Sequence, residues 1–161
     1  MVADQEQSSL CAAATLLRQA RSAVLATAEG GQPYASLVTP ALDEAARPIL
    51  LLSNLATHTG HLRGNPRCAL FFEGAAATRN PQTTPRLCLI GVAQGVSAEA
   101  AREPYLRIHP YATAYAGFED FSFWKLQVFN VKFIGGFAQA YDLSFIALQH
   151  EILKIGEAAP G

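Results

Sequence analysis

The chain has little charge, few cysteines and no long apolar run, and each shortage excludes a class of protein. Only 16% of its 161 residues are charged and the net charge is -1, so no broad basic surface is available to bind nucleic acid. The three cysteines are odd in number, lie far apart and form no Cys-x-x-Cys pair, which favours small buried thiols in a reducing compartment. Because the chain lacks a signal-like start and an apolar run of about 20 residues, we expect a cytoplasmic protein without a membrane partner.

Apolar residues, in contrast, make up half of the chain. A length of 161 residues suits one domain with a full core. We therefore predict a single domain over residues 1–161, with a flexible N-terminus at 1–9 and a C-terminal tail at 146–161. High apolar content with low charge also indicates that a second subunit covers part of the surface. A homodimer is the simplest arrangement of that kind.

Strand-like runs separated by turns dominate the sequence. Six are expected, at 22–28, 33–39, 49–53, 67–73, 87–96 and 123–137, the last a strand pair bent at Gly135-Gly136. Helical patterns follow Ser8-Ser9, with an end near Arg21, and follow Ser97. No G-x-G-x-x-G motif follows a strand, so a Rossmann domain has no support. Six antiparallel strands with few helices predict a mainly β fold, a closed or nearly closed barrel.

Residues 50–72 form the most informative segment. An apolar strand leads into a turn of hydroxyl and imidazole groups, Thr57, His58 and Thr59, where a short helix opens before Asn65-Pro66 stops it. The first backbone N–H groups of a helix lack partners, and the helix dipole favours an anion there. The segment therefore predicts a phosphate cradle. The alternative is a threonine-capped surface helix with a solvated histidine beside it.

Four motifs in order resemble those of the flavin-binding split barrels of the pyridoxamine 5'-phosphate oxidase-like family. They are residues 34–43, residues 50–72, Pro85-Arg86-Leu87 and residues 133–141. The resemblance covers residues 16–143 and is strongest to the haem-utilisation branch. It implies a six-stranded antiparallel split β-barrel with flanking helices, forming a homodimer with FMN bound between the subunits.

The resemblance also implies site residues. It places the FMN phosphate at the turn of residues 57–59, and it places the flavin ring along Ser36, Val38, Thr39 and Ser53. A flat ring can take hydrogen bonds from the backbone and small side chains of such a strand. Judged from the residues alone, an ordinary half-buried strand remains the alternative.

Two further positions belong to the expected flavin site. Arg86 would pair with the phosphate or lie near the flavin pyrimidine ring, the alternative being an edge residue whose charge reaches into solvent. Gln139 stands where the branch usually carries a basic residue. A charge that could reach the partner subunit's flavin is therefore absent.

The resemblance implies an FMN-dependent oxidoreductase acting on a small-molecule substrate. Flavin supplies the redox step itself, so no protein acid or base is required, and we identify no catalytic residue. The alternative is a haem-binding or haem-degrading protein, which needs an apolar cleft and an axial ligand; His150 and His109 are the candidates. A non-catalytic flavin-binding protein is the third possibility. His58 and His61 lack a third ligand nearby, so no metal site is expected.

Overall fold

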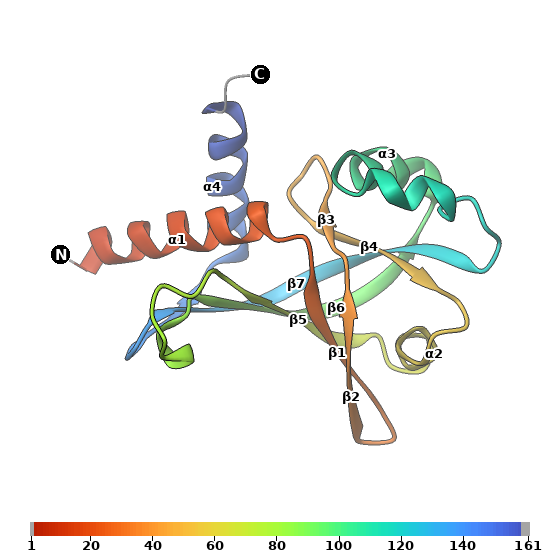
Figure 1. The fold of residues 1–161 in the computed structure, drawn as a ribbon, viewed down its shortest axis with the longest axis horizontal. Helices are drawn as coiled ribbons and strands as arrows, with labels where there is room; N and C mark the ends of the chain where they lie inside the picture. The colour runs from red at the N-terminus through yellow and green to blue at the C-terminus, as the bar shows by residue number, and fades with distance from the viewer. Residues whose placement is uncertain (1, 159–161) are drawn as a thin grey trace.

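The structure is a computed structural model that describes residues 2–158, with the side chains of residues 4–156. In this part of the chain, eight strands form one antiparallel sheet (Figure 1). They are β1 (Ala23–Glu29), β2 (Gln32–Val38), β3 (Ala41–Leu42), β4 (Pro48–Ser53), β5 (Arg67–Glu73), β6 (Arg86–Val96), β7 (Phe121–Gly136) and β8 (Gln139–Leu143). The order across the sheet is β2-β1-β5-β6-β7-β4-β3, and β8 also pairs with β7. The outermost strands β2 and β3 do not pair with each other, so the barrel is split.

Alternating burial gives the sheet an inner and an outer face. In β5, Leu70 and Phe72 are buried while Phe71 between them is exposed. Strand β4 differs, since its residues from Pro48 to Leu52 are all buried. The side chains on its inner face join the main core, whereas those on its outer face pack in a second cluster with residues of a helix.

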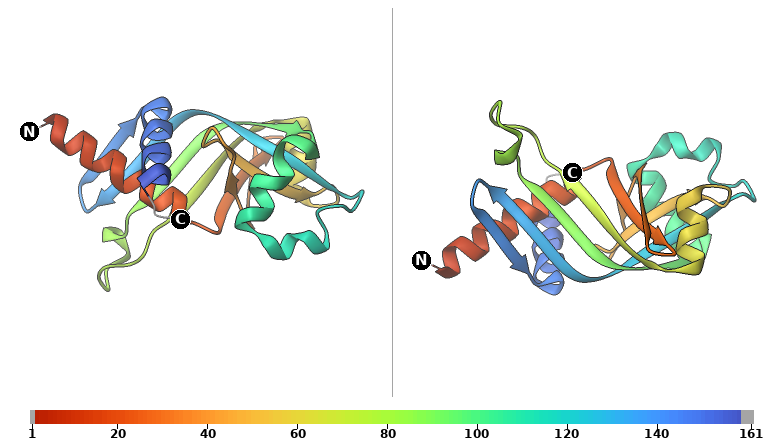
Figure 2. Two further views of the ribbon diagram at one scale, coloured as in Figure 1. Left: turned by 90° about the horizontal axis from the view of Figure 1, so that it is seen from above. Right: turned by 90° about the horizontal axis from the view of Figure 1, so that it is seen from below.

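Four α-helices and two 3-10 turns complete the described fold. The helices are α1 (Val2–Gln19), α2 (Thr57–Gly64), α3 (Ala98–Ile108) and α4 (Phe145–Ala158), and the turns are η1 (Pro81–Thr83) and η2 (Pro110–Ala114). Figures 1 and 2 show α1 and α4 crossing over one end of the sheet, with α2 and α3 at the other end. Helix α3 covers the outer side of β4. None of the helices in residues 2–158 combines the length and the apolar character that crossing a bilayer requires.

The sequence predicted six strands, whereas the structure describes eight. The two additional strands, β3 and β8, are short and were not recognised as separate strands. Strand β3 has only two residues and pairs with the start of β4. The expected bend at Gly135-Gly136 is confirmed as a register shift between Ile134 and Gly136 in the pairing of β7 with β8. The chain reverses just after it, at Phe137 and Ala138, with Ala138 at a positive φ of 59°. Glycine usually occupies such a position, so the alanine found here gave no sequence signal for the turn.

The helices at both ends of the chain are longer than the sequence analysis assigned. The helix expected after Ser8-Ser9 is confirmed as α1, which begins earlier, at Val2, and ends at Gln19, slightly before the predicted end, while Met1 lies outside the described residues. The expected tail at 146–161 is helical through Ala158, and residues 159–161 lie outside the described part. The two helices stabilise each other, because Gln7 Nε2 donates to Glu151 Oε2 at 3.1 Å and Leu148 and Ile152 enter the core.

The cysteines are free, and one of them departs from the prediction of buried thiols. Cys68 is buried and Cys88 half-buried, but Cys11 is exposed and donates to Glu151 Oε1 at 3.0 Å. That hydrogen bond is the main cause of the raised pKa of Cys11, with smaller contributions from burial and from the charge of Glu151. Cys11 is therefore a polar contact between α1 and α4.

Candidate functional site

The two threonines of the expected phosphate cradle point in different directions at the start of α2. Thr57 is exposed, whereas Thr59 is 0% exposed and its Oγ1 donates to the carbonyl oxygen of Ser53 at 2.7 Å. The residue before the helix, Ala56, provides no side-chain cap. The hydroxyl of Thr59 therefore holds the helix against the end of β4. What the first turn offers an anion is the Thr57 hydroxyl and the first backbone N–H groups.

His58 connects α2 to the strand that was expected to line the flavin. Its Nδ1 lies 3.1 Å from Ser36 Oγ, and its Nε2 is buried without a hydrogen-bond partner in the described residues. Burial, and next the nearby charge of His61, lower the pKa of His58. The ring is therefore neutral near pH 7 and presents a nitrogen that a ligand can engage.

His61 forms the second connection between α2 and the sheet. Its Nδ1 lies 3.1 Å from Thr27 Oγ1, and its Nε2 lies 3.6 Å from the Glu29 carboxylate. The ring of Tyr34 approaches it edge-on at 5.5 Å between centroids. The structure thus brings Ser36, Thr57 and His58 together at one corner of the barrel, with His61 fixing α2 to β1.

The other residues expected along the flavin ring are engaged within the fold. Val38 is buried on the inner face opposite Ala23. Thr39 Oγ1 lies 2.9 Å from the hydroxyl of Tyr105 on α3, whose pKa burial raises to about 12. Ser53 is half-buried, and its Oγ accepts from the backbone N–H of Leu55 at 3.3 Å.

Arg86 and Gln139 lie at the opposite end of the sheet from α2. Arg86 starts β6, and its Nη1 donates to the carbonyl oxygens of Gln82 and Thr84, both at 3.2 Å. Gln139 starts β8, opposite Gly136, and is exposed. Val92 of β6 pairs with Arg67, the residue that starts β5 just after α2. Arg86 lies six residues before Val92 on the same strand, a separation of about 20 Å. A single chain therefore does not bring these two residues to the α2 corner.

The two candidate haem ligands have opposite environments. His109 is 1% exposed; its Nε2 donates to the carbonyl oxygen of Pro40 at 2.9 Å, and its Nδ1 lies 3.2 Å from the Tyr111 hydroxyl. A carbonyl only accepts, so Nε2 carries the proton and Nδ1 accepts from Tyr111. Both nitrogens of His109 are occupied in this conformation. His150 is exposed on α4 and leaves both nitrogens accessible.

Sequence reasoning missed an apolar surface on the outer face of the sheet. Strand pairing aligns two rows of side chains there. The rows, which we call the outer apolar face, are Leu37-Val24-Phe71-Cys88 and Ala35-Ala26-Ala69-Ile90. Leu37 is 75% exposed, and Val24, Phe71 and Ile90 are each more than a third exposed. The signal was present as adjacent large apolar residues, such as Val24-Leu25 and Phe71-Phe72, which predict strands that are apolar on both faces.

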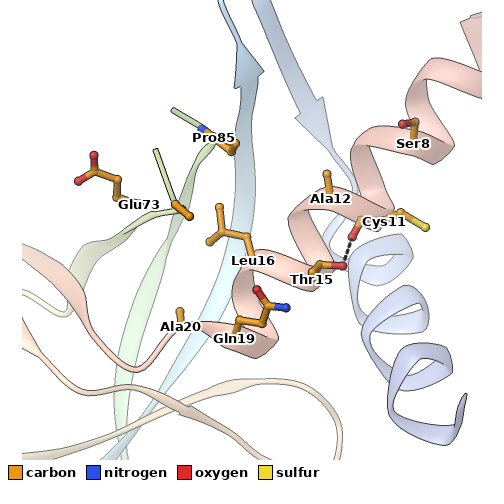
Figure 3. Close-up of a pocket in the computed structure, with 11 residues that line it drawn as sticks. Ser8, Cys11, Ala12, Thr15, Leu16, Gln19, Ala20, Glu73 and Pro85 are labelled. Carbon is orange, nitrogen blue, oxygen red and sulfur yellow. Dashed lines mark hydrogen bonds between the residues drawn. The ribbon is translucent and has the colours of Figure 1, made fainter. Parts of the chain in front are cut away.

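The largest hollow near the ends of β5 and β6 is separate from all these residues. It measures about 670 Å³ and lies against α1, where Leu16 points towards Pro85 (Figure 3). Its lining is mainly small and apolar, and no residue predicted for the flavin or haem site contributes to it.

Two proteins that are similar to this chain have names that include haem. The chain is 38% identical over 116 residues to the non-canonical haem oxygenase HOZ of Arabidopsis chloroplasts, covering 69% of this chain and 34% of the plant protein. A haem-binding protein of Mycobacterium smegmatis has a similar structure, with a TM-score of 0.81, 29% identity and coverage of 88% of this chain and 60% of that one. This chain thus spans about a third of the plant protein and three fifths of the mycobacterial one.

A more distant structure shares the fold. HutZ, the haem storage protein of Vibrio cholerae, gives a TM-score of 0.62 at 18% identity, with coverage of 78% of this chain and 94% of that one. The pyridoxamine 5'-phosphate oxidase family model matches residues 11–135. That match runs from the second half of α1 to Gly135 near the end of β7, so it includes α2, α3 and strands β1 to β6 but not β8 or α4. With most of its length matched and a split barrel as its fold, the chain belongs to the pyridoxamine 5'-phosphate oxidase family.

Proposed function

We propose that this protein binds haem and works as a homodimer in haem utilisation. The observation that supports this most is the outer apolar face, two adjacent rows of apolar side chains on one surface of the sheet. Contiguous apolar surface of this kind marks sites where a protein or an apolar ligand binds. Haem needs an apolar cleft, and the names of the plant and mycobacterial relatives include haem.

Pairing of two chains through the outer apolar face would explain why large apolar side chains are exposed there in the single chain. Leu37 and Ile90 are exposed in the single chain, and the face carries no charged side chain in its two rows. A two-fold dimer uses the same patch on both subunits, so each apolar row would meet another. The rim of such an interface then offers apolar walls for a flat macrocycle.

His150 is our candidate for the axial ligand of the haem iron, because its ring is accessible. The chain has four histidines. Both ring nitrogens of His61 and of His109 lie next to protein groups, and the unpartnered Nε2 of His58 is buried, whereas His150 is exposed on α4. An accessible imidazole is the common axial ligand of haem.

Replacing His150 tests this assignment. We expect His150→Gln to change the absorption spectrum of the haem-loaded protein and to weaken haem binding about tenfold or more, because an amide does not replace an imidazole as a ligand. The measurement is a haem titration followed by absorbance. Lys154→Gln, which changes an exposed side chain one turn further along α4, is the control and should keep the spectrum of the unmodified protein. An unchanged spectrum in His150→Gln would exclude this residue as the ligand.

FMN binding is the second candidate function, and one observation favours it. The buried Nε2 of His58 has no partner in the described residues, and it lies beside the exposed first turn of α2. Thr57, His58 and Ser36 would then contact the cofactor, while Arg86 and Gln139 would have to come from the partner subunit. FMN would supply electron or hydride transfer to a small molecule. Haem remains the first candidate because the buried hydroxyl of Thr59 leaves the phosphate cradle with fewer donors.

A further inference from the structure

A gap in strand pairing interrupts one edge of β7. Strand β4 pairs with β7 from Phe121 to Lys125, and β8 pairs with it from Val131 to Gly136. Between these ladders, residues 126–130 have no strand beside them on that edge. Backbone groups along an unpaired edge are open to other partners.

Helix α4 and the β3–β4 hairpin border this gap without closing it. Gln149 Nε2 on α4 donates to the carbonyl oxygen of Ala45 at 2.7 Å, which joins the helix to the hairpin. The space left measures about 370 Å³, within the size range of small-molecule sites. We call it the β7 notch; its polar lining is Arg47, Gln94, Lys125, Gln127 and Gln149.

The charge of the β7 notch is positive. Its lining contains one lysine, one arginine and three glutamines, and no acidic side chain. Leu126, Val128 and Phe145 add an apolar part. Cations and amide N–H groups around an apolar floor are the groups that bind an oxyanion attached to an organic body.

Lys125 is the least compensated cation of the notch. The chain has three lysines, and Lys132 and Lys154 each form an ion pair with a carboxylate. Lys125 is half-buried between Ile49 and Gln94, with no carboxylate partner in the described residues. An anionic ligand would supply the counter-charge that these residues do not provide.

Arg47 contributes a fixed but partly neutralised charge. Its Nε donates to Asp43 Oδ2 at 2.8 Å, and Asp43 Oδ1 accepts from the backbone N–H groups of Ala45 and Arg47. The guanidinium is thereby oriented, while its two terminal amino groups remain for another acceptor. Together with Lys125, the notch holds somewhat more than one uncompensated positive charge, which suits a ligand with one oxyanion group.

We propose that the β7 notch binds the oxyanion group of a small organic molecule, a carboxylate or a phosphate monoester, through Lys125 and Arg47. The three glutamines orient the oxyanion, and Phe145 contacts the organic body. None of the notch residues belongs to the outer apolar face or to the α2 corner, and His150, which follows Gln149 on α4, does not line the notch.

Thermal unfolding and calorimetric titration of the haem-free protein test this site. The probes are sodium benzoate, sodium butyrate and inorganic phosphate, with sodium chloride at equal ionic strength as the reference. We expect at least one probe to raise Tm and to bind at saturation, and Lys125→Met to weaken its binding about tenfold. Lys132→Met, which removes an exposed, paired lysine from the same strand, should bind as the unmodified protein does.

A second variant keeps the test informative if Lys125→Met folds poorly. Gln94→Glu places a carboxylate on an exposed position opposite Lys125, and it should abolish binding while the lysine remains. A response to benzoate or butyrate supports a carboxylate ligand, and a response to phosphate alone supports a phosphate monoester. Binding that is equal in all variants, or no response to any probe, would overturn the proposal.

Discussion

Phe71→Glu is expected to convert the homodimer that we propose into a monomer. Phe71 lies in the middle of the outer apolar face, paired with Val24 on one side and Cys88 on the other. In the dimer that we propose, glutamate would lose the burial of an aromatic ring, which contributes about 2 kcal/mol, and would place an unpaired charge in an apolar interface. The dimer dissociation constant should therefore rise about 100-fold or more. Sedimentation velocity over a range of protein concentrations measures this change.

Phe118→Glu is the matched control for this substitution. Phe118 is 57% exposed in the turn before β7, outside both rows of the outer apolar face. The same change in size and charge there should leave the protein dimeric. If Phe71→Glu remains as dimeric as the control, or the unmodified protein is a monomer throughout, the outer apolar face is not the subunit interface.

Gly91→Ala should produce the largest loss of stability among single methyl additions in the sheet. A Cβ at Gly91 would lie 1.9 Å from the carbonyl oxygen of Gln127 and 2.8 Å from its carbon. Both neighbours are backbone atoms at the β-bulge where β6 and β7 change register, so they cannot rotate away as a side chain would. We expect the free energy of unfolding to fall by about 3 kcal/mol or more, and Tm by about 10 °C.

Gly95→Ala on the same strand separates this clash from a general effect of replacing glycine. A Cβ at Gly95 would have no atom within 4 Å. Alanine also lowers the conformational entropy of the unfolded chain, so we expect the substitution to be neutral or slightly stabilising. Thermal unfolding followed by circular dichroism compares the two variants. Equal melting temperatures would show that the bulge accommodates the methyl group, contrary to the geometry described.

Strands could be predicted from the sequence where a pattern of neighbouring residues was sufficient to identify them. The apolar runs of β5 and β6 and the polar turn before α2 were sufficient, because these signals lie within a few residues. The second half of α1 was predicted, but its first turns and α4 were not, since the two helices stabilise each other through residues such as Gln7 and Glu151, which are 144 positions apart. The spacing of Leu148 and Ile152 nevertheless carried a helical signal that could have been used.

In the candidate site, too, features set by neighbouring residues could be predicted, whereas contacts between residues far apart in the sequence could not. Sequence placed Thr57 and Thr59 in one helical turn, and helix geometry could have added that residues two apart do not face each other. The pairing of His58 with Ser36 and the occupation of both His109 nitrogens depend on contacts across the fold. No pattern of neighbouring residues could have shown them.

A haem titration of the unmodified, cofactor-free protein tests the proposed function most directly, with an FMN titration run beside it. If the protein binds haem, its absorption in the Soret region will grow with added haem and reach a plateau at a fixed ratio of haem to chain. A Soret band that never saturates and matches free haem, together with FMN fluorescence that is quenched to a clear endpoint, would contradict haem binding and identify the protein as a flavoprotein.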